Sequence, residues 1–129
     1  MLKKEIISTE HAPAAVGSYS QAIKVSDFLF VSGQLGLEPK TGILAGEIEA
    51  QTRAALNNVK EILKAGKSSL ENVVKVNIYL KNMGDFTKVN AIYSEFFTSA
   101  FPARCCIEVG SLPKDSMIEI EAIALCKNK

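Results

Sequence analysis

The sequence lacks tryptophan and contains one histidine and three cysteines among its 129 residues. The histidine, His11, lies in a polar N-terminal stretch, which favours a solvated loop side chain over a typical zinc ligand or a catalytic relay. The GxxxxGKS/T phosphate loop, the GxGxxG dinucleotide turn and the GxSxG nucleophile elbow are all absent. These absences predict a protein without a metal or a cofactor, which carries out cofactor-free chemistry or only binds a ligand.

Positive and negative charges are nearly balanced, with 15 Lys and Arg, 14 Asp and Glu and a net charge of +1. The electrostatic field of such a protein is too weak to bind a polyanion, so neither nucleic acid nor a membrane is expected as a partner. No segment approaches the ~18 apolar residues that a membrane-spanning helix needs, and no apolar run follows the N-terminal lysines as in a signal peptide. We therefore expect a cytoplasmic protein whose cysteines, Cys105, Cys106 and Cys126, are thiols.

What the sequence does contain is the composition of one folded domain over residues 1–129, with 47% hydrophobic and 22% charged residues. Its periodicity predicts strands at residues 3–8, 19–25, 28–32, 74–80, 104–109 and 117–126. A loop begins at Gly33. One helix starts near Glu47 and ends with Gly66 at its C′ position, and a second begins at the N-cap Asp85 and stops before Pro102.

The predicted order of elements is β-β-β-α-β-α-β-β, an α+β fold with a mixed sheet and both helices on one face. In the strand at 74–80, Val74 and the alternate apolar residues after it form one buried face. The last strand instead carries apolar side chains on both faces, such as Ile120 and Ile123. Because two helices cover only one face of a sheet, this pattern predicts an oligomer that buries the second face.

Candidate chemistry is concentrated around Arg104. By the two-residue period of a strand, Arg104, Cys106 and Glu108 share one face, and Glu119 and Glu121 share a face of the last strand. The short connection predicts that these two strands are antiparallel neighbours. Two interpretations stay open, namely a structural salt bridge between the strands and a pocket in which the guanidinium binds a substrate carboxylate through two parallel donors.

Four segments resemble a known family. The residues FPARCCIEVGSLPKDSMIEIEA, at 101–122, are similar to the signature segment of the RidA family, also called YjgF, of reactive intermediate deaminases. The likeness extends through GSYSQA at 17–22, VSGQ at 31–34 and VNAIY at 89–93, and it covers residues 3–125. Ser18 departs from the pattern, because many relatives have proline before the tyrosine, and this departure bears on how firmly Tyr19 is placed.

The resemblance implies a YjgF/chorismate-mutase-like fold and a homotrimer with a barrel-like core, with a cleft between each pair of neighbouring subunits. Arg104 matches the family's carboxylate-binding arginine, and Glu119 its acidic residue. Further substrate-binding positions match Tyr19, Ser32, Gly33, Asn90 and Cys106. For Tyr19, Ser32 and Asn90, plain packing or turn bonding is an equally open interpretation.

The implied activity is that of a 2-iminobutanoate/2-iminopropanoate deaminase, a hydrolase of C–N bonds other than peptide bonds. Such an enzyme converts 2-aminoacrylate, 2-aminocrotonate and their 2-imino tautomers to 2-keto acids and ammonia. A covalent role for Cys106 is disfavoured, because no second basic residue is evident to form its thiolate. Three alternatives remain: a non-catalytic regulatory protein that binds small carboxylates, an endoribonuclease or translation inhibitor, and a stress-activated holdase.

Overall fold

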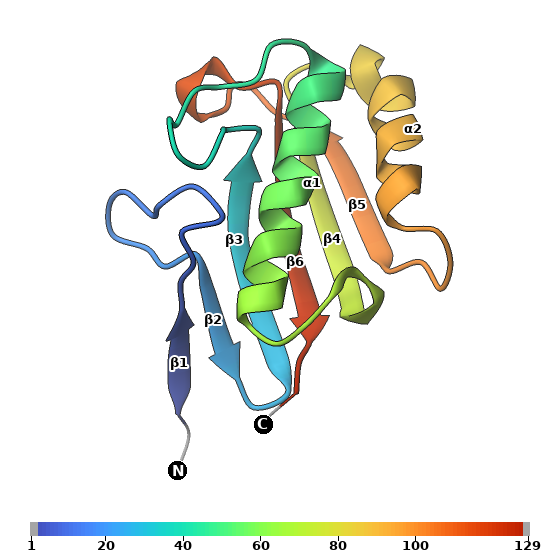
Figure 1. The fold of residues 1–129 in the computed structure, drawn as a ribbon. Coiled ribbons are helices and arrows are strands. Elements are labelled where there is room, and N and C mark those ends of the chain that lie inside the picture. Colours follow the sequence, from blue (N-terminus) through green and yellow to red (C-terminus); the bar gives the residue numbers. More distant parts are fainter. Residues whose placement is uncertain (1–2, 128–129) are drawn as a thin grey trace.

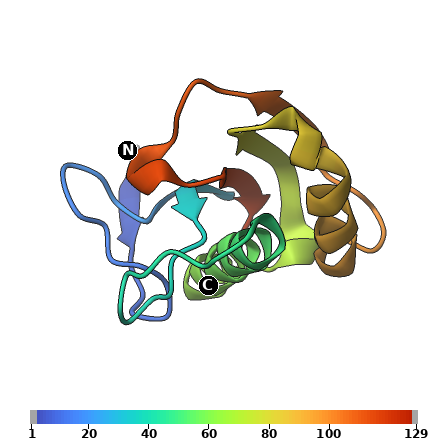
Figure 2. The same ribbon diagram turned by 90° about the horizontal axis from the view of Figure 1, so that it is seen from above.

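The computed structural model describes residues 3–127 and contains a six-stranded mixed sheet (Figure 1). Its strands are β1 (Lys4–Ile7), β2 (Ala22–Val25), β3 (Phe28–Leu35), β4 (Val73–Leu80), β5 (Ala103–Glu108) and β6 (Ile118–Leu125). The helices α1 (Ile48–Ala65) and α2 (Phe86–Phe96) lie on one face of this sheet (Figures 1 and 2). Short 3₁₀ helices span Leu70–Asn72, Met83–Asp85 and Pro113–Asp115. The predicted α+β order of strands and helices is confirmed.

The sheet order β1-β2-β3-β6-β4-β5 places β6 in the interior and β5 at an edge. The β4–α2–β5 crossover makes β4 and β5 parallel, whereas the other strand pairs of the described sheet are antiparallel. The prediction that the strands of Arg104 and Glu119 are neighbours is therefore wrong, because β4 lies between them. The segment after β5 instead carries the chain past β4 to the interior of the sheet.

The core lies between the sheet and α1, where Leu56 and Ile62 are fully buried together with Ile78. The expected alternation in β4 fails at its first residue. The register with β6 shifts between Val73 and Lys75, so Val73 is buried and Val74 is exposed. The prediction of a buried Val74 is wrong because a local irregularity reverses the alternation there.

Strand β3 continues through Gly33 to Leu35, so the prediction of a loop beginning at Gly33 is wrong. The step from Val31 to Gln34 on β3 lies opposite the shorter step from Ala122 to Ile120 on β6. This mismatch is a β-bulge that contains Ser32 and Gly33. Because a bulge interrupts the hydrogen-bonded ladder, its backbone finds other partners. The Ser32 N–H donates to the Gln21 carbonyl, and the carbonyls of Ser32 and Gly33 accept from Gln34 Nε2.

Gly66 was predicted to be the C′ residue of α1, but the helix ends one residue later. Gly66 is the C-cap, with φ −86°, and the left-handed C′ residue is Lys67, with φ 62°. The N–H groups of Lys67 and Ser68 donate to the carbonyls of Lys64 and Leu63, which is the Schellman pattern. Glycine is needed at 66 for space, because a Cβ there would lie 2.6 Å from Leu29 Cδ2.

The second helix begins at its expected N-cap, Asp85, but the Asp85 side chain makes no capping hydrogen bond. Asn82 takes that role one turn earlier, where its Oδ1 accepts a hydrogen bond from the Gly84 N–H at 2.8 Å. The capping side chain therefore belongs to the 3₁₀ turn that leads into α2.

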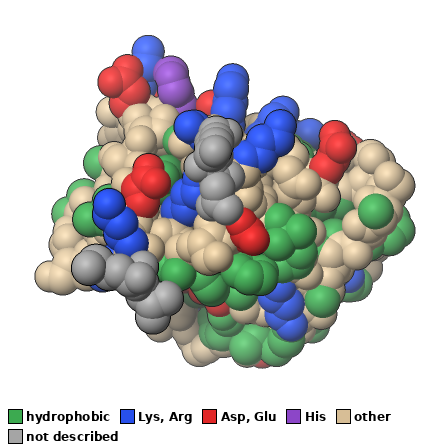
Figure 3. Space-filling model, turned by 90° about the horizontal axis from the view of Figure 1, so that it is seen from below, with side chains coloured by type: hydrophobic (Ala, Val, Ile, Leu, Met, Phe, Trp, Pro, Cys, Tyr) green, Lys and Arg blue, Asp and Glu red, His purple; other side chains and the backbone are tan. Residues whose placement is uncertain are grey.

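The sheet face opposite the helices carries exposed apolar side chains. Leu29 and Val31 point into the core, so Phe28 and Phe30 between them point away, and both are more than two-fifths exposed. Leu125 of the neighbouring β6 is exposed as well. Figure 3 shows hydrophobic side chains gathered on one side of the molecule seen from below. In the described residues, no helix is both long and apolar enough to cross a membrane.

Candidate active site

Arg104 lies on the edge strand β5, and its side chain packs against α2. Its Nη1 donates a hydrogen bond to Asn90 Oδ1 at 2.8 Å. Its Cζ lies 4.8 Å from the ring centroid of Tyr93 and 5.5 Å from that of Phe86, both within cation–π range. The helical spacing of 86, 90 and 93 places all three α2 residues on one face. The guanidinium is thus held in place while most of its five donors remain available to a ligand.

A pocket of about 460 Å³ adjoins Arg104 and is also lined by Asn90, Tyr93, Ser94, Phe101 and Pro102. Tyr93 is buried, yet its hydroxyl has no hydrogen-bond partner among the described residues. Burial raises the pKa of Tyr93, and the neighbouring Arg104 guanidinium offsets part of that rise through its charge and through a donor directed toward the hydroxyl, too poorly placed to form a regular hydrogen bond. An arginine with free donors beside a pocket is suited to binding a carboxylate.

The free edge of β5 adds a backbone donor to this pocket region. The Val109 N–H donates to the Leu80 carbonyl at 2.8 Å, within the parallel register of β4 and β5. Because ladder bonds alternate along a strand, the N–H groups of Arg104 and Cys106 point to the open edge. Burial raises the pKa of the Cys106 thiol, and Arg104 only partly counters that effect. Cys106 therefore presents a backbone donor and a protonated thiol, which supports the expectation that it is not a nucleophile.

Glu119 lies on β6 and faces the opposite side of the sheet. Its carboxylate covers the β3 bulge, since a Cβ on Gly33 would lie 2.1 Å from Glu119 Oε2. Burial raises the pKa of Glu119, and the charge of Glu121 raises it further. Ser32 does not point a free hydroxyl proton at Glu119, because its Oγ donates to the Ser20 carbonyl at 2.6 Å. The bulge and Glu119 together place a carboxyl of raised pKa beside irregular backbone.

A second pocket, of about 880 Å³, contains Glu119 together with Tyr19, Ser32 and Gly33. Tyr19 lies in the loop before β2 and is 53% exposed, so the prediction of a strand that begins at Tyr19 is wrong. Glutamate Glu121 and two lysines of the surrounding loops, Lys40 and Lys114, also line this pocket. Four of the seven predicted site residues therefore lie on this side of the sheet.

The predicted site is divided between the two faces of the sheet. We call Arg104, Asn90 and Cys106, with the α2 aromatics, the arginine half-site, and Glu119 with Tyr19, Ser32 and Gly33 the glutamate half-site. The β4 register pairs Arg104 with Val76, which is buried under the helices, and Glu119 with Tyr79 on the other face. A single chain does not bring the halves together. The alternative of a salt bridge between neighbouring strands is wrong for the same reason.

Two features of the arginine half-site were not predicted from the sequence. Glu108 Oε1 accepts a hydrogen bond from the Met83 N–H at 2.7 Å, and so ties β5 to the turn before α2. Tyr93 and Phe86, which were not among the predicted site residues, form the platform under Arg104. Their spacing to Asn90 could have revealed this platform. Residues three or four positions apart on a helix share a face, so Phe86, Asn90 and Tyr93 lie side by side.

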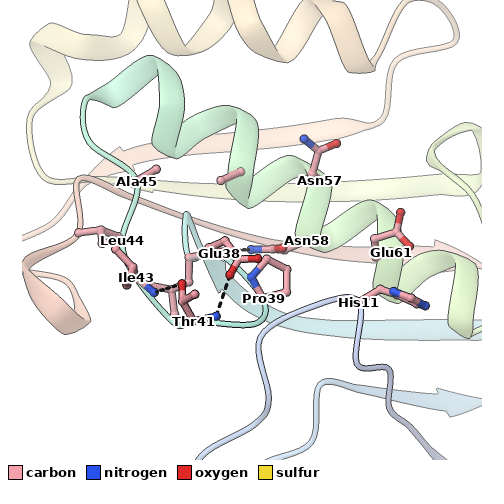
Figure 4. A pocket seen from close by; sticks show the side chains of 12 residues that line it. His11, Glu38, Pro39, Thr41, Ile43, Leu44, Ala45, Asn57, Asn58 and Glu61 are labelled. Carbon is pink, nitrogen blue, oxygen red and sulfur yellow. Dashed lines mark hydrogen bonds between the residues drawn. The ribbon is translucent and has the colours of Figure 1, made fainter.

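A third pocket lies between α1 and the loop at 37–45, and it contains none of the predicted substrate-binding or catalytic residues (Figure 4). Its volume is about 540 Å³, and its lining is mainly apolar, with His11 and Glu61 at its rim. Nor do three His, Cys, Asp or Glu side chains in residues 3–127 converge as metal ligands. The groups suited to chemistry are those of the two half-sites.

Comparisons with known proteins place this geometry in a family. The family described as endoribonuclease L-PSP matches residues 9–126. A RutC family protein of Pyrococcus horikoshii is 55% identical over 122 residues, covering 94% of this chain and 97% of that protein. A 2-iminobutanoate/2-iminopropanoate deaminase of Salmonella typhimurium is 47% identical over 122 residues, covering 92% and 95%.

A solved structure agrees with these relatives. The crystal structure of Escherichia coli TdcF with bound serine superposes with a TM-score of 0.92 at 36% identity, covering 95% of this chain and 99% of that one. The fold, the order of motifs and the relatives agree over nearly the whole length. The chain belongs to the endoribonuclease L-PSP family, the YjgF or RidA family that its motifs resemble.

Proposed function

We propose that this protein hydrolyses 2-imino acids, the tautomers of 2-aminoacrylate and 2-aminocrotonate, to 2-keto acids and ammonia. The observation that carries the proposal is the Arg104 guanidinium, which is fixed by Asn90 and two aromatic rings with donors left for a ligand. A relative of 47% identity bears the name of this deaminase. The TdcF structure holds serine, a small molecule with a carboxylate, on the same fold.

The division of the site supports assembly from two chains. In this proposal the arginine half-site of one copy meets the glutamate half-site of the next, and a closed ring of three copies forms three such sites. The apolar sheet face that includes Phe28, Phe30 and Leu125 supplies surface for such contact. Localisation in the cytoplasm and the homotrimer both remain parts of this proposal.

Binding begins with the substrate carboxylate. Arg104 donates two parallel hydrogen bonds to its oxygens, a planar geometry that suits guanidinium better than an ammonium group. The outward N–H of Cys106 lies on the same strand edge and donates to the substrate as well. These contacts fix C2 of the imino acid, and orientation of this kind accelerates a reaction that also proceeds in water.

Glu119 of the neighbouring copy then moves the protons. A water oxygen bonds to C2, the C=N electron pair moves to nitrogen, and nitrogen takes a proton from Glu119. The Glu119 carboxylate accepts the proton that the added water loses, and then gives it to the nitrogen a second time. The C–N bond breaks, ammonia leaves with the bonding pair, and the hydroxyl proton returns to Glu119 as the C2 carbonyl forms. Acid–base catalysis of this kind contributes about 10²–10⁴-fold.

The family description names a different reaction, endoribonuclease activity. Neither half-site contains the single histidine, since His11 lines the separate groove of Figure 4. The net charge of +1 also provides little attraction for a phosphate backbone. These observations favour imine hydrolysis over RNA cleavage for this chain.

Mixed assemblies test the proposal. Arg104→Ala and Glu119→Gln chains are each expected to be inactive when a dehydratase generates 2-aminoacrylate and the appearance of pyruvate is timed. Co-expression of both chains under different affinity tags restores intact sites where the arginine half of one variant meets the glutamate half of the other. In a ring of three that carries both tags, about a third of the sites are intact, because only one of the three junctions joins an intact arginine half to an intact glutamate half.

Each variant co-expressed with itself under the same two tags is the control. A site shared between chains is supported when the doubly tagged mixture is active and both controls are inactive. A mixture as inactive as the two controls contradicts shared sites, and a native protein without imine hydrolysis contradicts the proposed reaction.

A further inference from the structure

Glu121 is held on the uncovered sheet face by two donors from β4. Its Oε2 accepts hydrogen bonds from Asn77 Nδ2 at 2.9 Å and from the Tyr79 hydroxyl at 2.8 Å. The register places Asn77 opposite Glu121 and Tyr79 opposite Glu119. The bond to Glu121 raises the pKa of Tyr79 to about 12, so the hydroxyl remains a donor throughout the physiological pH range. The carboxylate of Glu121 is therefore fixed in one position by two hydrogen bonds.

Glu119 has the opposite surroundings. It lies two residues away on the same face of β6, and both carboxyls line the pocket of about 880 Å³. In the described part of the chain no group donates a hydrogen bond to Glu119, whose carboxylate lies over Gly33. Burial raises the pKa of Glu119, and the like charge of Glu121 raises it further. Because Glu119 accepts no hydrogen bond in the described residues, no donor offsets these two effects.

Other ionisable groups face the same region from neighbouring elements. The exposed Lys40 and Lys114 belong to loops that line the pocket. From the remaining elements come Tyr19 of the loop before β2, Lys75 and Tyr79 of β4, and Cys105 of β5. Burial and the charge of Glu121 raise the pKa of Glu119, and neither Lys40 nor Lys114 lowers it.

We infer that Glu121 is a positioning residue for the proposed hydrolysis: its carboxylate, fixed by Asn77 and Tyr79 in the pocket that also holds Glu119, favours the proton-donating form of Glu119 that the imine nitrogen needs. This inference rests on the proposed function, because Glu119 touches the substrate only if the site assembles as described. Glu121 itself acts through Glu119 and not on the substrate.

The test combines a titration with a rate profile. Carbon-13 NMR of labelled glutamate carboxyls follows Glu119 through pH in the intact oligomer, with Glu119→Gln identifying its resonance. In Glu121→Gln the titration of Glu119 is expected to move to lower pH. The alkaline fall of kcat/KM is expected to move in the same direction, since an acid catalyst is lost as pH rises through its pKa.

Two further variants separate this effect from general disruption. Tyr79→Phe removes one donor from Glu121 and is expected to shift both curves the same way by a smaller amount, should Glu121→Gln not fold. Glu71→Gln removes the same charge from the exposed 3₁₀ helix at the other end of β4 and is expected to shift neither curve.

The outcomes are distinguishable. An unmoved Glu119 titration in a folded Glu121→Gln or Tyr79→Phe oligomer overturns the role of Glu121, even where imine hydrolysis is normal. A moved titration in a protein that never hydrolyses imines overturns the proposed function, and with it the catalytic meaning of the coupling. Movement of both curves supports the inference.

Discussion

The arginine half-site is built from residues close in sequence, whereas the glutamate half-site is gathered from distant segments. Residues 86 to 104 supply the whole platform around Arg104, within one β4–α2–β5 crossover. The pocket around Glu119 draws on the loop before β2, the β3 bulge and the segment after β5. This difference suggests a division of labour, in which a local unit binds the substrate and a long-range assembly supplies proton transfer.

The largest expected effect separates binding from chemistry. Arg104→Ala should lower kcat/KM for 2-aminoacrylate by roughly 10²–10⁴-fold, since each hydrogen bond to a charged group contributes about 1.5–3 kcal/mol and two are lost. It should also abolish the rise in melting temperature that we expect from 2-ketobutyrate, the keto-acid product of 2-aminocrotonate. Coupled kinetics and thermal melting check both effects.

A matched control for Arg104→Ala is Arg53→Ala. Arg53 forms an exposed ion pair with Glu95 at 2.6 Å, away from both half-sites, and its loss should leave rate and ligand stabilisation unchanged. Wild-type turnover by a folded Arg104→Ala protein would remove the arginine half-site from the mechanism.

The local half-site was the more predictable one for a physical reason. The two-residue period correctly placed Arg104 and Cys106 on one face, whereas Asn90 was identified through the family resemblance and not through its spacing to the aromatic residues. The pairing of β5 with β6 was predicted from the shortness of their connection, and it failed because the α2 crossover sets β5 parallel to β4. The composition held a corrective signal, since β5 carries Arg104 and Glu108 on its helix-facing side, as an edge strand can, whereas every residue on that side of β6 is apolar.

The glutamate half-site depends on details that periodicity does not encode. The bulge at Ser32 and Gly33 appears in the sequence only as a glycine within a strand-like run, and a glycine there is equally typical of a turn. The sequence favoured Gly66 as the left-handed residue after α1, but Lys67 takes that conformation. Gly66 lacks a side chain because Leu29 fills the space beside it. Such features arise from close packing between segments far apart in the chain.

Glu119→Gln should show the complementary behaviour to Arg104→Ala. We expect kcat to fall by about 10²–10⁴-fold because the proton donor and acceptor is lost. Stabilisation by 2-ketobutyrate should persist, because the arginine half-site is intact. The same kinetics and melting experiments check this, and loss of ligand stabilisation in Glu119→Gln would show that the two halves do not divide the work.

Gly33→Ala sharpens the comparison without changing an ionisable group. The added Cβ would lie 2.1 Å from Glu119 Oε2, so the carboxyl has to move while the fold is kept. Displacement of a catalytic group by about 1 Å lowers rates by on the order of 10²-fold. Gly110→Ala is the control, because a Cβ there meets nothing within 4 Å. Equal rates for both variants would show that the position of Glu119 over the bulge is not used.

The smallest expected effect concerns the buried Tyr93 hydroxyl under Arg104. An unpaired buried polar group costs about 1–3 kcal/mol, so Tyr93→Phe should raise the melting temperature at fixed protein concentration. The ring that carries the cation–π contact remains, so kcat/KM should stay within about twofold, whereas Tyr93→Leu loses roughly 0.5–2 kcal/mol of that contact. If Tyr93→Phe instead weakens 2-ketobutyrate binding, the hydroxyl is a donor to the ligand. The arginine half-site would then contribute a second side chain to carboxylate recognition, and the binding half would be larger than the platform described.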